Sequence, residues 1–254
     1  MVQLAEKSWP EAGKIFEEND VAILPVGSTE QHGPHNPLGT DHLIASRMSL
    51  EVGERTGVPV LPLIPVGVSV HHRQFPGSLW VPPAVFRDYI RAIALSVASH
   101  GIRKLLVING HGGNTPSLME VAGELRREHG VFAAVASAFP PMDGHAGEGE
   151  TSANLYFHGH LVDMSKAVDT KQNEELGGLK VEGFNFIYPG RFAWDTPDLS
   201  PTGVIGNAGV TIRATTASEE KGREAMELHI DDLCALVEEL KKAEIKGLLP
   251  KPHK

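Results

Sequence analysis

Acidic and imidazole side chains recur in three short segments that are rich in glycine. The first, LPVGSTEQHGPHNPLGTDH, contains Glu30 and His32 two positions apart and Asp41 nine positions later. Positions i and i+2 of an extended chain point the same way, so this carboxylate and imidazole would lie side by side. The glycines and prolines that follow allow the chain to turn back and bring in Asp41. The segment therefore predicts part of a metal site with oxygen and nitrogen ligands.

The other two segments supply further candidate ligands. KLLVINGHGGNTPS places His111 in a glycine-rich turn directly after an apolar run, and MDGHAGEGETSANL contains His145, Glu148 and Glu150. A glycine-rich turn before a helix is also typical of phosphate binding, but neither GxxxxGKS nor GxGxxG occurs in the chain. Several buried carboxylates close together are costly unless a cation neutralises them. Two bound metal ions would activate water and polarise a carbonyl, which is the chemistry of hydrolysis.

Each of these residues also has an ordinary structural explanation. A histidine such as His32 or His111 is more often a hydrogen-bonded structural residue than a ligand. Asp41 could cap a helix, and the two glutamates of the third segment could be solvated loop charges. The chain has 13 histidines, so their number alone indicates nothing. The metal-site hypothesis depends on the joint arrangement.

Apolar runs precede the three segments and predict the strands that position them. Four runs rich in Val, Ile and Leu are typical of strands buried on both faces, at residues 21–26, 58–66, 104–108 and 131–136. Segments with helical periodicity lie between them, at residues 41–55, 83–99 and 117–128. Each of these helical segments is followed by a glycine that can end a helix, at Gly57, Gly101 and Gly130.

This alternation predicts an α/β fold with a mainly parallel central sheet and helices on both faces. Binding sites in such folds lie at the carboxyl ends of the strands, where the candidate ligands occur. Residues 177–216 break the alternation with Gly, Pro and aromatic residues and predict a lid or a subunit contact. A final helix begins near Ser218, with a buried face formed by Met226, Ile230, Leu233, Val237 and Leu240.

Composition limits the classes of function. The formal net charge is -9, from 23 Lys and Arg against 32 Asp and Glu, and no dense basic run is present, so we expect no nucleic-acid partner. No apolar run approaches the roughly 20 residues needed to cross a bilayer, and the first residues lack a signal-peptide core. We therefore expect a cytoplasmic protein with one domain over residues 1–254. Cys234 is the single cysteine, which excludes a cysteine-based metal site.

At the three segments the sequence resembles the creatininase (creatinine amidohydrolase) family. The resemblance runs through PVGSTEQHGPHNPLGTDH, HRQFPGS, NGHGGN, HAGEGETS and LVDMSKAVD, and therefore covers most of residues 20–170. It is looser in the C-terminal third, at SPTGVIGNAGVT and SEEKGRE. It implies an α/β fold with a largely parallel sheet and a homohexamer built from dimers.

The resemblance also implies roles for individual residues. One metal ion would be held by Glu30, Asp41 and His111, and the second by His32, Asp41 and Glu150, so that Asp41 bridges them. Zn is the expected ion, with Mn or Fe as alternatives. His145 would be the catalytic residue that passes a proton to the leaving nitrogen. His72 and Glu148 would contact the substrate or support the metal ligands.

Two departures bear on the substrate. Creatininases carry an acidic residue at the position of Gly113, and tryptophans that this chain lacks in AFPPMDGH. Both departures argue against creatinine. Similar proteins include a deformylase of a formylamino-pyrimidine nucleotide, a peptidase that matures mycofactocin, and a hydrolase that opens an oxidised inositol ring. The sequence predicts hydrolysis of a C–N amide bond in a small molecule. Carbon–carbon ring opening and a non-catalytic metal-binding protein are the alternatives.

Overall fold

A computed structural model describes residues 3–141, 144–182, 186–187, 194–207 and 209–251. Its central sheet contains three parallel strands in the order β1 (Val21–Val26), β2 (Lys104–Asn109) and β3 (Phe132–Ser137). The ladder begins at Val21, Lys104 and Phe132, which lie in one row across the sheet. The predicted parallel sheet is confirmed. β2 extends one residue further than expected, and β3 begins and ends one residue later than expected.

The prediction of a continuous strand at residues 58–66 is wrong. Val60 and Ile64 form isolated parallel bridges with β1, at Ile23 and Val26, so the segment runs beside the sheet without a full ladder. Its sequence, VPVLPLIPV, has a proline at every third position. Proline has no backbone N–H to donate to a ladder, so an apolar and extended segment of this kind pairs only intermittently.

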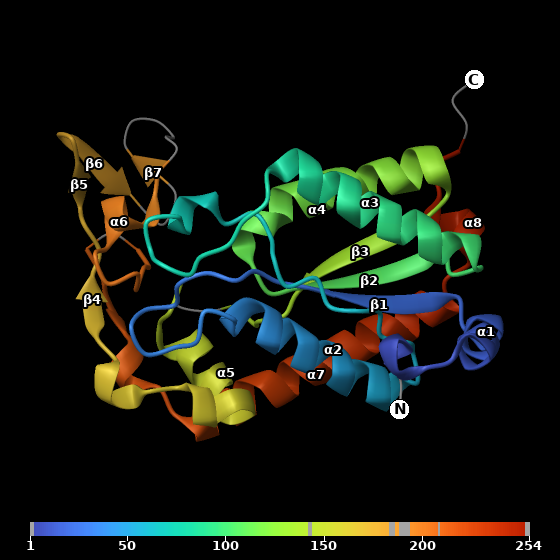
Figure 1. The fold of residues 1–254 in the computed structure, drawn as a ribbon, viewed down its shortest axis with the longest axis horizontal. Helices are drawn as coiled ribbons and strands as arrows, with labels where there is room; N and C mark the ends of the chain where they lie inside the picture. Colours follow the sequence, from blue (N-terminus) through green and yellow to red (C-terminus); the bar gives the residue numbers. More distant parts are fainter. Residues whose placement is uncertain (1–2, 142–143, 183–185, 188–193, 208, 252–254) are drawn as a thin grey trace.

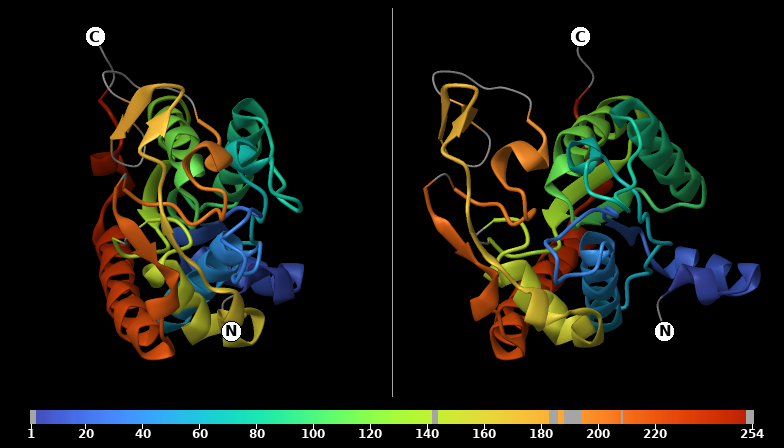
Figure 2. Two further views of the ribbon diagram at one scale, coloured as in Figure 1. Left: turned by 90° about the vertical axis from the view of Figure 1, so that its left-hand side faces the viewer. Right: turned by 60° about the vertical axis from the view of Figure 1, so that its left-hand side comes forward.

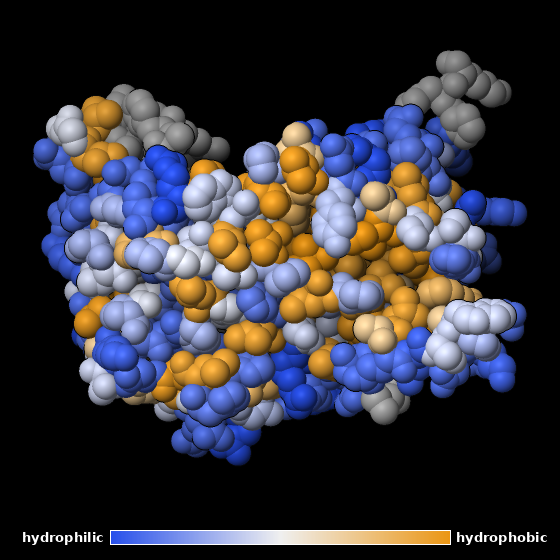
Figure 3. All heavy atoms as spheres, viewed as in Figure 1, coloured by the Kyte–Doolittle hydropathy of each residue, from blue (hydrophilic) through white to orange (hydrophobic). Residues whose placement is uncertain are grey.

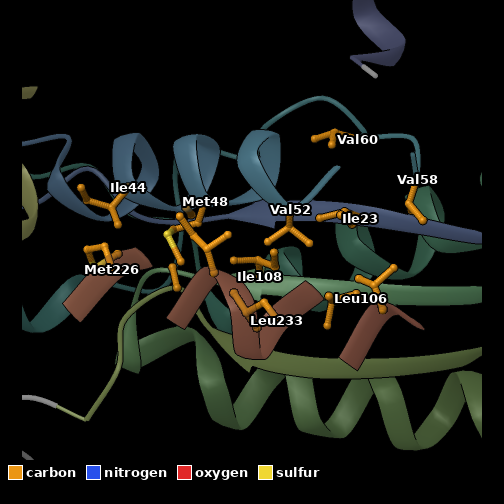
Figure 4. Close-up of a cluster of buried hydrophobic side chains, with 14 of the residues drawn as sticks. Ile23, Ile44, Met48, Val52, Val58, Val60, Leu106, Ile108, Met226 and Leu233 are labelled. Atoms are coloured by element: carbon orange, nitrogen blue, oxygen red, sulfur yellow. The ribbon is translucent and has the colours of Figure 1, made fainter. Parts of the chain in front are cut away.

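Helices cover both faces of the sheet, as predicted (Figures 1 and 2). One face carries α2 (Thr40–Thr56) and α7 (Glu219–Lys242), whose apolar side chains share a core with β1 and β2. The other carries α3 (Pro83–Ser99) and α4 (Thr115–Glu124), which continues as a π-helical turn at Leu125–His129. Figure 4 shows Met48 of α2, Met226 of α7 and Ile108 of β2 in one cluster of buried apolar side chains.

Glycines end the helices where expected. Gly57, Gly101 and Gly130 have φ values of 74°, 103° and 64°, a left-handed backbone that residues with a side chain rarely adopt. The final helix is also confirmed. The Ser218 side chain accepts a hydrogen bond from the Lys221 N–H at its start. Its predicted apolar face is buried along its length, at Met226, Ile230, Leu233, Val237 and Leu240.

The remaining elements are short or peripheral. In chain order they are η1 (Leu4–Glu6), α1 (Trp9–Glu18), η2 (Val70–His72), η3 (Gly112–Asn114), α5 (Glu148–His158), η5 (Gly159–Leu161), η6 (Met164–Lys166), β4 (Asp169–Lys171), β5 (Glu175–Leu176), β6 (Leu179–Glu182), β7 (Phe186–Ile187), α6 (Thr196–Leu199), β8 (Thr211–Arg213), η7 (Ala214–Thr216) and α8 (Ile245–Leu248).

The region predicted as a lid, residues 177–216, pairs with the residues just before it in small antiparallel units. β5, β6 and β7 form one, and β4 pairs with β8 in another. Figure 1 shows β4 to β7 and α6 at the end of the molecule toward which β1, β2 and β3 run, where the strands finish. Part of this region, at 183–185, 188–193 and 208, lies outside the described residues. Across the described residues, no helix combines the length and the apolar character that a bilayer crossing requires.

A buried lysine joins the start of β2 to the end of α7. Lys104 is 1% exposed, and its Nζ donates to the carbonyl oxygens of Leu240 at 2.7 Å and Ala243 at 2.9 Å. Nζ also lies 2.7 Å from Asp20 Oδ2. These bonds satisfy carbonyls at the helix end, which have no partner within the helix.

We expect Lys104→Met to lower the free energy of unfolding by about 2 kcal/mol, because charged hydrogen bonds of this kind contribute about 1.5–3 kcal/mol each and methionine still fills the space. Urea unfolding of wild type and variant checks this. Lys242→Met, on the exposed face of α7, is the matched control and should change stability by less than about 0.5 kcal/mol. Equal midpoints for wild type and Lys104→Met would contradict the expectation.

Candidate metal centre

The loop after β1 places Glu30 and His32 at the end of the sheet. Both side chains are fully buried. The backbone N–H of Glu30 donates to the Leu38 carbonyl at 2.9 Å, so the loop folds back toward α2. Gly27 permits this close approach, because a Cβ there would lie 2.4 Å from the Cα of His42. Asp41, in the first turn of α2, is thereby brought to the pair.

The loop after β2 brings His111 to the same place. A Cβ at Gly110 would lie 2.2 Å from the Asp41 carbonyl oxygen, so only glycine allows the two main chains to meet. Two asparagines hold this loop. Asn109 Nδ2 donates to the His111 carbonyl at 2.7 Å, and Asn114 accepts from Val68 N–H at 2.8 Å and donates to the Gly27 carbonyl at 3.0 Å.

Glu150 completes the arrangement from the first turn of α5. Its Oε2 accepts a hydrogen bond from the Ala146 N–H at 2.6 Å. Ala146 is not a glycine but has a positive φ, of 56°. The loop that leads to Glu150 is therefore strained at this residue. The structure therefore brings together all five predicted ligand residues, which we call the ligand cluster: Glu30, His32, Asp41, His111 and Glu150.

Two subsets of the ligand cluster have the spacing of metal ligands. His111 Nδ1 lies 3.1 Å from Glu30 Oε1 and 3.2 Å from Asp41 Oδ2. His32 Nε2 lies 3.0 Å from Asp41 Oδ1 and 3.6 Å from Glu150 Oε2. Atoms that share a Zn ion at about 2.0–2.2 Å in tetrahedral geometry are separated by about 3.3–3.6 Å, and the four distances, at 3.0–3.6 Å, are close to that range. Asp41 contributes one oxygen to each subset.

Hydrogen bonds to main-chain carbonyls orient both imidazoles. His111 Nε2 donates to the Val68 carbonyl at 3.0 Å, and His32 Nδ1 donates to the Glu30 carbonyl at 3.2 Å. A neutral ring bonded in this way points its other nitrogen, with a lone pair, at the carboxylates. Such outer contacts are typical of metal-binding histidines.

Several buried polar atoms in the cluster form no hydrogen bond with a residue outside it. They are Glu30 Oε1 and Oε2, His32 Nε2 and Asp41 Oδ2. Buried carboxylate oxygens without a partner are costly, and a cation among them would remove that cost. The donor atoms present therefore fit divalent metal ions.

Burial and neighbouring charges shift the pKa values of the cluster. Burial opposes ionisation of Asp41, but the His32 and His111 imidazoles lower the pKa of Asp41 to about 2. Burial also opposes charging of His32, yet the Asp41 and Glu150 carboxylates raise the pKa of His32 to about 9. Burial raises the pKa of Glu150 to about 7. The cluster thus holds negative charge that requires positive charge beside it.

His145 lies against the cluster without belonging to either subset described above. Its Nδ1 is 3.9 Å from Glu150 Oε2 and 4.0 Å from Glu30 Oε1. Its Nε2 donates to the Gln31 carbonyl at 2.8 Å, which leaves Nδ1 as the nitrogen that faces the carboxylates. Burial and the neighbouring His32 hold the pKa of His145 well below its usual range. His145 also forms a third possible ligand group with Glu30 and His32.

His72 supports the cluster from a second side. It is 3% exposed, and its Nε2 lies 3.3 Å from Glu30 Oε1. Gln31, which the sequence analysis overlooked, contacts His72 Nδ1 at 3.0 Å and the Gly203 carbonyl at 3.2 Å through its amide nitrogen. Its position between the ligands Glu30 and His32 was the available indication.

Glu148 turns away from its neighbour Glu150. Both lie in the first turn of α5, where a separation of two residues rotates a side chain by about 200°. Glu148 forms an ion pair with Lys221 and a hydrogen bond with the Thr216 hydroxyl. Contact between Glu148 and a substrate stays a prediction.

Residues 194–206, the covering segment, dock onto the site. Thr196 Oγ1 is hydrogen-bonded to His72 Nδ1 at 3.0 Å. The main chains of His145 and Ile205 exchange two hydrogen bonds, of 2.7 Å and 3.0 Å. Arg73 Nη2 lies 2.6 Å from Asp195 Oδ2. The covering segment thus holds His72 and His145 in place.

A cavity of about 310 Å³ opens beside the ligand cluster. Its lining includes the two ligands His111 and Glu150. Its walls combine apolar and polar side chains from α4, from the end of β3 and from the loop that follows, including Thr115, Met119, Val135, Ser137, Phe139 and Pro140. Cavities of this size hold small organic molecules or parts of larger ones.

Comparisons with known proteins agree with this geometry. A family model described as creatinine amidohydrolase matches residues 5–237. A mycofactocin precursor peptide peptidase from Mycolicibacterium smegmatis is 37% identical over 142 residues, which span 54% of this chain and 57% of the relative. A 3-dehydro-scyllo-inosose hydrolase from Thermotoga maritima is 29% identical over 251 residues, which span 91% and 81%. A crystal structure of creatinine amidohydrolase superposes with a TM-score of 0.79 at 25% identity, covering 96% of this chain and 99% of that one.

Proposed function

Because this chain belongs to the creatininase family, we propose that it is a metal-dependent amidohydrolase that breaks a C–N bond in its substrate. The convergence of five buried or nearly buried ligands from three distant segments carries the proposal. Five residues of these types at one end of a parallel sheet serve no evident packing role, and their unpartnered oxygens and nitrogens favour bound cations.

We propose two divalent ions in the ligand cluster. One fits Glu30, Asp41 and His111, and the other fits His32, Asp41 and Glu150. Mixed imidazole and carboxylate ligands suit Zn first, with Mn or Fe as alternatives. When bound, such ions supply an activated water and a polarised carbonyl.

The chain's own groups then hold the substrate and move the proton. His145 Nδ1 faces the ligand cluster, and the Gln31 carbonyl fixes the ring by accepting from Nε2. This geometry lets Nδ1 take a proton near the cluster and pass it to the leaving nitrogen, as a general acid–base group does. His72 keeps Glu30 oriented, and the covering segment limits access of bulk water to both histidines.

An assay panel tests the proposal. The Zn-loaded and Mn-loaded proteins are incubated with N-formyl compounds, cyclic amides including creatinine, and short peptides, and release of formate or amine is measured. We expect turnover of at least one class that disappears after dialysis against a chelator and returns with metal. A metal-loaded protein that hydrolyses none of these classes would instead favour a non-catalytic metal-binding role.

Carbon–carbon ring opening of an oxidised inositol is the second candidate. The relative named as an inosose hydrolase matches over 91% of this chain, which favours testing this activity as well. Incubation with 3-dehydro-scyllo-inosose, followed by detection of the opened carboxylic acid, separates this activity from release of formate or amine.

We also propose that the chain works as a single domain, over residues 1–254, in a cytoplasmic homohexamer. Figure 3 shows apolar side chains gathered in the middle of one face. Leu79, Trp80, Val85 and Tyr89 are exposed over α3 and the segment before it. Monomeric proteins rarely leave several large apolar side chains exposed together, so the patch supports association.

Tyr89→Glu should therefore reduce the assembly to smaller species, because a charge placed in a buried apolar contact is costly. Light scattering after size exclusion measures the mass. Leu228→Glu, at an exposed apolar residue on α7, is the matched control and should leave the mass unchanged. An unchanged mass for Tyr89→Glu would remove this patch as the contact.

A further inference from the structure

The third strand of the central sheet has an exposed edge. Every residue of β1 and β2 is buried, whereas no residue of β3 is, and Ser137 is exposed. Successive residues of a strand point to opposite faces of the sheet, and helices cover both faces here. The exposure of β3 therefore comes from its outer edge.

The ladder with β2 shows which backbone groups lie on that edge. Phe132 N–H donates to the Arg103 carbonyl at 2.9 Å, and Ala138 N–H donates to the Asn109 carbonyl at 2.8 Å. Alternation along a parallel strand then turns the N–H and C=O groups of Ala133 and Val135 away from β2. In the part of the chain that the structure describes, no strand pairs with this edge. It is a template for another extended chain.

The exposed edge leads into the candidate metal centre. Val135 and Ser137, at the carboxyl end of β3, line the same 310 Å³ cavity as the ligands His111 and Glu150. A chain that paired with β3 would therefore enter this cavity. Met119 and Phe139 border the cavity and would meet its side chains.

We propose that the substrate is a peptide that binds as an added strand along the outer edge of β3, with its scissile amide at the ligand cluster. This inference rests on the proposed amidohydrolase function. The N–H and C=O groups of Val135 would exchange hydrogen bonds with alternate residues of the peptide. Hydrolysis adds the hydroxyl of water to the carbonyl carbon and a proton to the nitrogen, and yields a carboxylate and an amine.

A second copy of this chain is the competing occupant of the edge. The cavity favours a peptide, because the edge and the metal centre share the lining residues Val135 and Ser137. Pairing between two copies would use the edge of β3 but would not explain why the edge and the metal centre share a cavity. The Ser137 carbonyl already accepts a hydrogen bond from His229 Nε2 at 2.9 Å. It is therefore not free to pair with the peptide, and the added strand would end before Ser137.

The first test removes one backbone donor. Val135→Pro deletes the outward N–H but leaves the ladder with β2, and Val135→Ala is the matched control that loses the same side chain and keeps the N–H. Zn-loaded wild type and variants are incubated with a degenerate library of N-acetylated, C-amidated octapeptides, and products are identified by mass spectrometry. For a cleaved sequence, kcat/KM should be about tenfold lower for Val135→Pro than for Val135→Ala, with equal Zn content. Equal values in two folded variants would overturn the proposal.

The second test leaves the protein unchanged, so it holds even if Val135→Pro fails to fold. A peptide that the protein cleaves is resynthesised with one backbone amide N-methylated at a time. The methylated amides are those on the side of the scissile bond that would extend along β3. Loss of kcat/KM at alternate amides supports strand pairing, and uniform or absent losses overturn it.

The outcomes also separate the peptide proposal from the proposed hydrolase function. If the library stays intact but N-formyl amino acids are hydrolysed, the peptide proposal alone is overturned. If neither is hydrolysed, the proposed hydrolase function is overturned too. If Val135→Pro changes the assembly mass but not peptide cleavage, a second copy occupies the edge and the proposal is wrong.

Discussion

Replacing Asp41 with alanine is expected to strip most of the bound divalent metal and to lower kcat/KM more than about 100-fold. Asp41 Oδ1 lies 3.0 Å from His32 Nε2 and Oδ2 lies 3.2 Å from His111 Nδ1, so one side chain serves both proposed ions. Loss of an outer-shell contact alone costs about 10–100-fold in affinity or activity, and loss of a bridging ligand should exceed that.

Elemental analysis of the purified variant measures the metal, and circular dichroism shows whether the fold is retained. Asp88→Ala is a matched control, because Asp88 is 72% exposed on α3 and pairs with Arg91 there. It should keep metal and turnover. If the Asp41 variant retained two equivalents of metal, Asp41 would not be the bridge, and the assignment of the two ions would have to be changed.

His145→Ala should have the opposite pattern, with metal retained and turnover lost. General acid–base groups contribute about 10²–10⁴-fold, so kcat should fall by about that factor. The KM for a substrate held by the cavity walls should change little. Metal content, kcat and KM are measured on the same preparations, with His129→Ala at a partly exposed position as the matched control.

The His145 variant also decides between two arrangements of the site. His145 forms a possible ligand group with Glu30 and His32, besides the two groups that contain Asp41. If His145→Ala lost one equivalent of metal, His145 would be a ligand and another group would have to carry the proton. Retention of both equivalents supports its role as the proton carrier.

The sheet and its covering helices could be predicted from the sequence because burial dominates there. A strand such as VAILPV is apolar at every position, and helical segments that end at Gly57 or Gly130 show both their periodicity and their stop. The segment at 58–66 failed for a reason visible in the same residues. Its apolar content places it beside β1, but its prolines prevent a ladder.

The ligand positions were predictable because each follows a strand of one parallel sheet, whose carboxyl ends meet. The direction in which each side chain points within its segment was not predictable. Residue type and spacing alone did not distinguish Glu148 from Glu150, yet the first turn of α5 sends the two side chains in different directions. The contacts of Gln31 with Gly203 and of His72 with Thr196 join residues more than 120 positions apart, and no local pattern encodes them.

The close main-chain contacts at Gly27 and Gly110 have a consequence for how new specificities arise. Because backbone meets backbone there, the main-chain positions of Asp41 and His111 are set independently of the apolar side chains that line the cavity. Met119, which is exposed at the cavity wall, can be exchanged without moving Asp41 or His111. Selection, or an engineer who wants a different amidase, could therefore reshape these walls while the reactive centre stays fixed.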